Sequence, residues 1–202
     1  MQIKKKWALL SLCIAAVLIL GACGGGNASQ SPPNVTASSD ADLSSSTGYT
    51  SEWKLNIDTV SLEGESVTSA EFKDNTLTIL NIWATWCPPC VVELPHLKEI
   101  SEIFSDKGVQ VVGVLQDGIK ELGVPDESTI ENAKILLAAA EAEYMVILPD
   151  ETLALEFINH MQYFPTTFFL DSNGEVVRTV IGANDAESWE AIINEVLAEI
   201  SK

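Results

Sequence analysis

One stretch of this chain constrains the fold more than any other. A run of seven mostly apolar, β-forming residues, Leu77–Trp83, leads within three residues into Cys87-Pro88-Pro89-Cys90. A run with so little polar alternation is typical of a central strand covered on both faces. After the cysteines, apolar residues recur at three- to four-residue spacing until about Ser105, which predicts a helix. The sequence therefore places two cysteines where a buried strand gives way to a helix.

The rest of the domain is expected to alternate between strands and helices. Ser128 and Glu131 have the spacing of a capping box, which predicts a helix over 129–140. The Asp-Ser-Asn-Gly sequence at 171–174 is typical of a hairpin turn. The other expected elements are strands at 53–60, near Val67, and at 109–115, 144–148, 166–170 and 175–181, a short helix at 152–158, and a terminal helix at 185–200 capped by Asn184 or Asp185. This order predicts an α/β fold with a central mixed β-sheet and helices on both faces.

Composition limits the class of partner. The 202 residues include 29 acidic and 11 basic side chains, which gives a formal net charge of −18. Nucleic-acid binding needs a basic surface that releases counterions from phosphates, so no nucleic acid is expected as a partner. Anionic lipid head groups repel such a chain as well, so attachment to a membrane requires a separate anchor.

The N-terminus has the pattern of an export signal. Lys4–Lys6 precede a mostly apolar run of 14 residues at 7–20, shorter than the ~18 residues or more of a membrane-spanning helix. Residues 20–23, Leu-Gly-Ala-Cys, resemble a bacterial lipobox, in which the signal is cut before the cysteine and the sulfur carries a diacylglycerol. An uncleaved anchor and a plain secretory signal are the alternatives. All three place the remaining chain outside the cytoplasm, because the lysines stay inside.

Three regions follow from this pattern. Residues 1–22 are the expected lipoprotein signal peptide, and residues 23–51, lipidated at Cys23, are the expected flexible tether. The tether is rich in Gly, Ser, Thr, Asn and Pro and has too few large apolar groups to fold. Residues 52–202 are the expected folded domain, anchored to the cell membrane through the bilayer-embedded lipid. Because Cys13 leaves with the signal and Cys23 carries lipid, only Cys87 and Cys90 remain for chemistry.

The spacing of these two cysteines predicts a different chemical role for each. Cys87 is expected at the helix N-terminus, where unpaired amides and the helix dipole favour a thiolate and lower the thiol pKa. Cys90 lies one turn further on, is turned inward and is more shielded. Both prolines between them fit a first helical turn, where no amide donor is lost. Cys87 is therefore the expected nucleophile, and Cys90 the residue that resolves the mixed disulfide.

Two other interpretations of the cysteine pair have less support. A zinc site needs about four ligands, and the chain adds only His96 and His160, at spacings unlike those of a zinc finger. A purely structural disulfide across so short a loop constrains the unfolded chain little. A redox-active pair is therefore expected, with no metal and no cofactor beyond the two sulfurs.

Two segments of the chain resemble one family. Residues 81–90 (NIWATWCPPC), followed by 93–95 (ELP), are similar to the active site of extracytoplasmic thioredoxin-like proteins of the TlpA/ResA type. Residues 164–171 (FPTTFFLD) resemble the cis-proline strand of that family. The resemblance covers 53–202 and implies a thioredoxin-like fold, with an N-terminal β extension and a helical insertion at 114–144.

The resemblance also implies roles for individual residues. Pro165 is expected to be cis and to face the cysteine pair, leaving the backbone beside Phe164 free to pair with a substrate peptide. Glu93, three residues after Cys90, is expected to serve in thiol acid–base chemistry, because partial burial raises a carboxyl pKa towards neutrality. The alternative for Glu93 is an ordinary acidic residue in the first turns of a helix. The expected substrate-binding residues are Trp86, Pro88, Phe164, Pro165 and Thr166.

Together these features predict a membrane-tethered thiol–disulfide oxidoreductase. It is expected to reduce disulfides in exported proteins. By family resemblance, apocytochrome c and repair enzymes are expected substrates, and a membrane thiol electron donor is expected to reduce the cysteine pair again. The same site can run as an oxidase, because direction depends on reduction potential. A peroxiredoxin-like peroxidase, a copper metallochaperone and a pure binding module are alternatives. The Pro-x-x-x-Thr-x-x-Cys pattern of the peroxidases is absent around Cys87. Copper metallochaperones resemble C-x-x-x-C, in which the cysteines are one residue further apart than in this chain.

Overall fold

The computed structural model describes residues 55–202. The predicted signal peptide (1–22), the lipidation site Cys23 and the tether (23–51) lie outside the described residues. Within the described part of the chain, no helix is both long and apolar enough to cross a bilayer.

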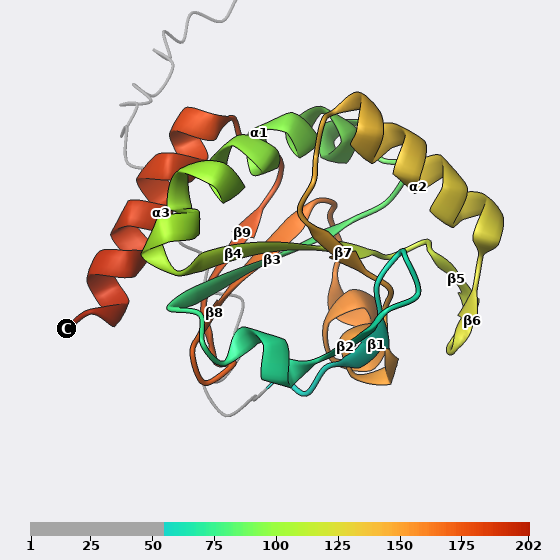
Figure 1. Cartoon of the computed structure of the whole chain (residues 1–202), viewed down its shortest axis with the longest axis horizontal. Helices are drawn as coiled ribbons and strands as arrows, with labels where there is room; N and C mark the ends of the chain where they lie inside the picture. Colours follow the sequence, from blue (N-terminus) through green and yellow to red (C-terminus); the bar gives the residue numbers. More distant parts are fainter. Residues whose placement is uncertain (1–54) are drawn as a thin grey trace, which may run out of the picture. The chain divides into compact units, whose positions relative to one another are not determined.

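A five-stranded mixed sheet forms the centre of the domain (Figure 1). Its strands, in spatial order, are β7 (Met145–Ile147), β4 (Val109–Leu115), β3 (Leu77–Trp83), β8 (Thr166–Asp171) and β9 (Val176–Ile181). The first three run parallel, whereas β8 is antiparallel to β3 and β9 is antiparallel to β8. All seven residues of β3 are buried, as expected for the apolar run that leads to the cysteines. The predicted mixed sheet and α/β class are confirmed.

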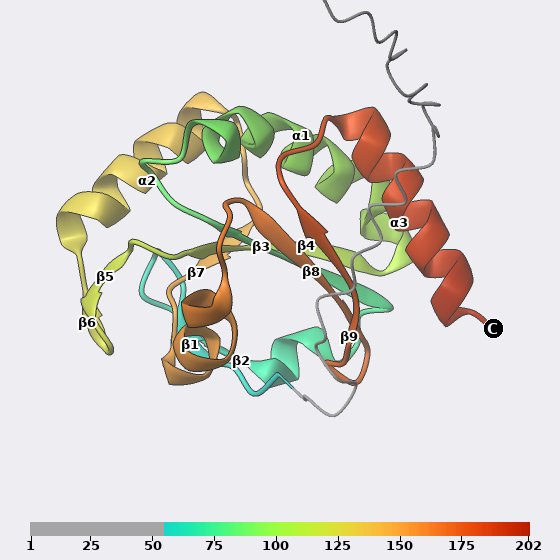
Figure 2. The same cartoon turned by 180° about the vertical axis from the view of Figure 1, so that it is seen from behind.

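Long helices cover one face of this sheet and short ones the other (Figures 1 and 2). On the first face, α1 (Pro88–Phe104) and α3 (Ala186–Ile200) pack on β3 and β4, and α2 (Glu127–Ala139) packs beside Trp83 and Val146. On the second face, apolar residues of β3, β4 and β8 contact short helical segments. These are η1 (Ser69–Phe72), the π-helix η3 (Leu153–Phe157) and the 3-10 turn η4 (Ile158–His160).

Local sequence explains where α1 and α3 begin. Cys87 is the N-cap of α1, and Pro88 and Pro89 occupy its first two positions, where a missing amide costs nothing. Asp185 caps α3 and accepts a hydrogen bond from the Ser188 amide at 2.9 Å. The structure thus selects Asp185 from the two predicted caps.

Two parts of the predicted chain path are corrected. The capping box at Ser128 is wrong: α2 begins earlier, and the Asp126 carboxylate accepts hydrogen bonds from both the amide and the hydroxyl of Ser128. Between β4 and α2 lies a small hairpin that the pattern did not predict, β5 (Ile119–Glu121) with β6 (Val124–Pro125). The N-terminal extension pairs β1 (Asp58–Val60) with β2 (Ser66–Thr68), so β1 is shorter than the predicted 53–60 within the described residues.

Candidate active site

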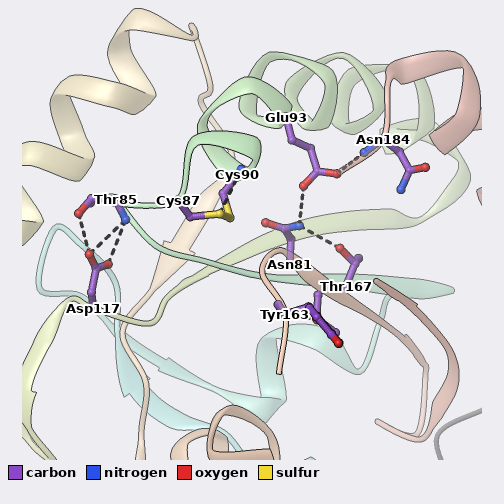
Figure 3. The surroundings of a disulfide bond; sticks show 10 residues. Asn81, Thr85, Cys87, Cys90, Glu93, Asp117, Tyr163, Thr167 and Asn184 are labelled. Carbon is purple, nitrogen blue, oxygen red and sulfur yellow. Dashed lines mark hydrogen bonds between the residues drawn. A yellow bond between two sulfur atoms is a disulfide. The ribbon is translucent and has the colours of Figure 1, made fainter. Parts of the chain in front are cut away.

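The two cysteines are joined at the start of α1 (Figure 3). Their sulfurs form a disulfide with an S–S distance of 2.11 Å, and their Cα atoms lie 5.3 Å apart. The Cys90 amide donates a hydrogen bond to the Cys87 Sγ at 3.3 Å. The first turn of the helix therefore directs a backbone donor at the sulfur expected to become the thiolate, which favours its charged form.

Both sulfur-bearing residues are buried. Cys87 is 3% exposed and Cys90 1%. The predicted shielding of Cys90 is confirmed, and Cys87 is nearly as buried. Both residues belong to one apolar cluster, against which the partly buried Phe164 packs. A substrate must therefore reach Cys87 past neighbouring side chains.

The peptide bond between Phe164 and Pro165 is cis, as predicted. Pro165 and Thr166 are buried at the start of β8, which pairs with β3 so that Thr166 lies opposite Ile82. The Thr166 hydroxyl donates to the Tyr163 carbonyl at 2.9 Å, and the Pro165 carbonyl accepts from the Gly182 amide at 2.9 Å. These bonds fix the cis-proline segment, whose Phe164 packs against the cluster that contains both cysteines.

Aromatic side chains flank the cysteine pair on the surface. Trp86 is 62% exposed, so its side chain does not pack into the core. Its ring meets that of Phe164 edge-on, with centroids 5.6 Å apart and planes inclined at 74°. Pro88 is exposed beside it. The contact between Trp86 and Phe164 thus joins the two segments, around 86–88 and 164–166, that hold the predicted substrate-binding residues.

Glu93 lies in a buried polar network beneath α1 (Figure 3). The residue is 1% exposed. One carboxylate oxygen accepts from the Asn184 amide at 2.8 Å and from the Trp189 indole at 3.1 Å. The other accepts from the Asn81 amide group at 3.1 Å, and Asn81 also donates to the Thr167 hydroxyl at 2.9 Å. Glu93 is therefore held by three donors from two parts of the chain, strand β3 and the start of α3.

The environment of Glu93 makes it an acid that titrates near neutrality. Burial raises the pKa of the Glu93 carboxyl from 4.5 to about 7, and the bonds from Asn184, Asn81 and Trp189 oppose part of this rise. Its hydrogen-bond donors are uncharged, so no cation restores the usual acidity. The surface-acid alternative for Glu93 does not fit a buried side chain with these partners.

Two further polar atoms lie close to this network. Burial, and secondly the charge of Glu93, raise the pKa of the Tyr144 phenol, so it stays protonated. Within the described residues, the Tyr144 hydroxyl and the Trp83 indole N–H are buried without a hydrogen-bond partner. Both side chains pack towards Gly113, the residue opposite Asn81 in β4: the point where a Cβ on Gly113 would lie is 3.1 Å from the Trp83 nitrogen. A side chain at position 113 would press on that indole and on Val146.

Asp117 is a site residue that the sequence analysis missed. Its carboxylate accepts from the Thr85 amide at 3.1 Å and from the Thr85 hydroxyl at 2.6 Å, and so fixes the loop that leads to Cys87 (Figure 3). Asp117 lies two residues after the end of β4, the parallel neighbour of β3. The carboxyl ends of adjacent parallel strands meet at one edge of a sheet. An acidic residue just after β4 could therefore have been predicted to lie near the cysteine loop.

The histidines play no part in the site as described. His96 lies half-buried on α1, and His160 is exposed at the end of η4. Among residues 55–202, no group of three or more His, Cys, Asp or Glu side chains is placed to hold a metal ion.

Known proteins share both the sequence pattern and the fold. The Redoxin family model matches residues 33–197. The thiol-disulfide oxidoreductase ResA of Oceanobacillus iheyensis is 28% identical over 121 residues, which cover 58% of this chain and 56% of the relative. The thiol:disulfide interchange protein HelX of Rhodobacter capsulatus is 29% identical over 115 residues, 57% of each chain. The chain thus spans just over half the length of these two relatives.

A solved structure confirms the fold. A thiol:disulfide interchange protein of the thioredoxin family from Chlorobium tepidum superimposes with a TM-score of 0.57 at 24% identity, over 70% of this chain and 93% of that protein. The ResA relatives confirm the resemblance drawn from the motifs, and the fold is thioredoxin-like. Because the family model matches well over half of the sequence, the chain belongs to the Redoxin family.

Proposed function

We propose that this protein is an extracytoplasmic thiol–disulfide oxidoreductase, held at the membrane through Cys23, that reduces disulfides in exported proteins. One observation carries the proposal: the Cys87–Cys90 disulfide caps a helix beside the cis Phe164–Pro165 segment, with the buried carboxyl of Glu93 one turn further along the helix. The names of the ResA and HelX relatives support this class of reaction.

The reaction begins from the dithiol form. The Cys87 thiolate attacks one sulfur of a substrate disulfide, a mixed disulfide forms, and the other substrate sulfur leaves as a thiolate. Cys90 then loses its proton and attacks the Cys87 sulfur, which releases the second substrate thiolate and closes the Cys87–Cys90 disulfide. The substrate gains two electrons, and the protein is oxidised by two. A membrane thiol donor returns these electrons and regenerates the dithiol.

Glu93 is proposed to take up the proton that Cys90 releases. Residues three apart on a helix share a face, and Cys90 and Glu93 are both buried on the inner face of α1. A carboxyl with a pKa of about 7 is half ionised at neutral pH, so it is equally able to accept and to return a proton. Asn81 positions this carboxyl but does not titrate.

The substrate and the location are the finer parts of the proposal. Apocytochrome c haem-site cysteines and oxidised repair enzymes are the proposed substrates, and the lipobox at residues 20–23 is the proposed route to membrane attachment. No cofactor beyond the cysteine pair is required, because both electrons are carried by the sulfurs.

Catalysed turnover tests the proposal. The purified protein is mixed with insulin and an excess of dithiothreitol, and the appearance of reduced insulin chains is followed over time. We expect each protein molecule to reduce many insulin disulfides, at a rate that rises linearly with protein concentration. A rate equal to that of dithiothreitol alone would contradict the proposal. The reduction potential of the pair, measured against glutathione, then decides between the reducing and oxidising directions.

A further inference from the structure

Two buried polar groups beside the Glu93 network have no described partner. Among residues 55–202, the Trp83 indole N–H and the Tyr144 hydroxyl are shielded from solvent and make no hydrogen bond. A buried polar group without a partner destabilises the fold, so such groups are rare and usually serve a function or bind an internal water molecule. The surroundings of the two groups indicate which explanation applies here.

Trp83 and Tyr144 lie around one glycine, next to a residue that bonds Glu93. Asn81 and Trp83 are two residues apart on β3, so their side chains share one face of the sheet. Gly113 pairs with Asn81 from the neighbouring strand β4. The point where a Gly113 Cβ would lie is 3.1 Å from the Trp83 indole nitrogen and 3.5 Å from Tyr144 Cε2, the ring carbon next to the one that bears the hydroxyl. Both unpaired groups are therefore beside Asn81, which donates to Glu93.

Glu93 has an unused acceptor position on the side of Asn81. Its Oε1 accepts from both Asn184 and Trp189, whereas its Oε2, within the described residues, accepts from Asn81 alone (Figure 3). A carboxylate offers about two acceptor positions per oxygen, so Oε2 can take one more donor. The charge of Glu93 also acts on Tyr144, where it is second to burial in raising the pKa of the phenol, so the two groups are near neighbours.

Protonation of Glu93 brings a second requirement. The three groups that bond its carboxylate are all N–H donors, and none of them accepts a hydrogen bond from the protonated acid in the orientation described. A water molecule suits both forms, because it donates to a carboxylate and accepts from a carboxylic acid. Buried waters in proteins typically bond about three polar groups that otherwise lack partners. An indole N–H, a phenol oxygen and a carboxyl oxygen form such a set.

We infer that Trp83, Tyr144 and Glu93 together bind one buried water molecule beside Gly113, and that Tyr144 is a positioning residue that holds this water against the Glu93 carboxyl. The inference rests on the role proposed for Glu93. In both forms of the acid the water accepts from the Trp83 indole and donates to the Tyr144 oxygen. Towards Glu93 it donates when the carboxyl is ionised and accepts when the carboxyl is protonated. The acid can therefore take up and return a proton without leaving an unpaired polar group.

The other titratable groups around Glu93 determine how this is measured. Cys90 lies on the same inner face of α1, and it does not titrate while the disulfide is intact. His96, one turn further along α1, is present in every variant below. On α3, hydrogen bonds from Ser188 lower the pKa of the exposed cap Asp185, which stays ionised at neutral pH. The oxidised protein without substrate is therefore the form in which the effect of Tyr144 on Glu93 is clearest.

A crystal structure of the oxidised protein, at a resolution that shows ordered waters, tests the site directly. We expect one water within about 2.7–3.2 Å of both the Trp83 nitrogen and the Tyr144 oxygen, with Glu93 Oε2 as its third partner. Direct packing of these side chains on one another, with no water between them, would overturn the inference.

Tyr144→Phe tests the positioning role, because it removes the hydroxyl and keeps the ring. The titration of Glu93 is followed by NMR through its side-chain carboxyl carbon, whose signal is identified by its loss in Glu93→Gln. Without the phenol oxygen the water loses one of three partners, and the ionised carboxylate loses its fourth donor. We expect the midpoint of the titration to rise by about one pH unit, because a hydrogen bond favours the ionised form over the neutral one.

Tyr163→Phe is the matched control. It removes the hydroxyl of a tyrosine that is 62% exposed, and it should leave the Glu93 midpoint at the wild-type value. An unchanged midpoint in Tyr144→Phe, or an equal rise in Tyr163→Phe, would overturn the positioning role. Failure of the wild type to reduce insulin would instead reject the proposed function, and it is measured independently of the water and of the Glu93 titration.

Discussion

Cys87→Ser is expected to lower the rate of insulin reduction at least about 1000-fold. The serine hydroxyl can occupy the same helix N-cap, but it is not ionised at neutral pH and cannot form the mixed disulfide. Cys90→Ser should retain the first attack, because Cys87 remains at the start of α1, but it cannot release the mixed disulfide with a thiol of its own. The measurements are the steady-state rate with dithiothreitol for Cys87→Ser and, for both reduced variants without dithiothreitol, a count of insulin disulfides opened per protein molecule.

The two cysteine variants control for each other. Each removes the same disulfide and so changes the folded protein alike, while only one removes the nucleophile. The account predicts about one attacked disulfide per molecule for Cys90→Ser and none for Cys87→Ser. Equal behaviour of the two variants, or retention of a tenth or more of the wild-type rate by Cys87→Ser, would contradict the assigned roles.

Glu93→Gln is expected to change how stability depends on pH. The unfolded chain releases the Glu93 proton near pH 4.5, whereas the folded protein holds it until about pH 7. The folded state therefore binds more protons across this window, so its stability is fully present below pH 4.5 and falls as pH rises through about 7. The interval between the two pKa values corresponds to about 3 kcal/mol of unfolding free energy. Urea unfolding of the oxidised protein at pH 5 and pH 8 measures this change.

Glutamine removes this titration while fitting the same space. Its oxygen can accept from Asn184 and Trp189, and rotation of the Asn81 amide lets the new amide group donate to Asn81. We therefore expect the variant to lose much less stability than the wild type between pH 5 and pH 8. Glu102→Gln, on an exposed position of the same helix, is the matched control and should keep the wild-type dependence. Equal pH dependence in the two variants would show that Glu93 does not titrate in this window.

The same variant tests the catalytic role of Glu93. An ionised carboxylate near a buried thiol raises the thiol pKa, and it also supplies the base for the resolving step. Glu93→Gln should therefore lower the pKa of the Cys90 thiol and slow release of the mixed disulfide. Unchanged thiol pKa values would remove Glu93 from the mechanism.

Elements with continuous patterns were predicted well. The strands β3 and β4 have the bounds read from the sequence, because unbroken apolar runs mark buried parallel strands. The start of α2 was misjudged because Asp126 and Ser128 are both good capping residues, and only the observed backbone shows which one is used. The β5–β6 hairpin has only a few residues per strand, too short to show a period.

The part of the site that lies on one short segment of the chain was predictable from the sequence. Cys87, Cys90 and Glu93 are related by helix geometry alone, so their shared location follows from spacing. The partners of Glu93 at Asn184 and Trp189 lie 91 and 96 residues further along the chain, and their contact depends on how α3 docks beside α1. The burial of Cys87 depends in the same way on tertiary packing, which includes Phe164.

The most direct test of the central claim is the identity of the bond formed with a substrate. Reduced Cys90→Ala protein is mixed with insulin, quenched in acid, digested and analysed by mass spectrometry. The account predicts one intermolecular disulfide that joins Cys87 to an insulin cysteine and persists because no second thiol lies one turn further along α1. Absence of any adduct, or an adduct confined to another cysteine of the chain, would contradict it.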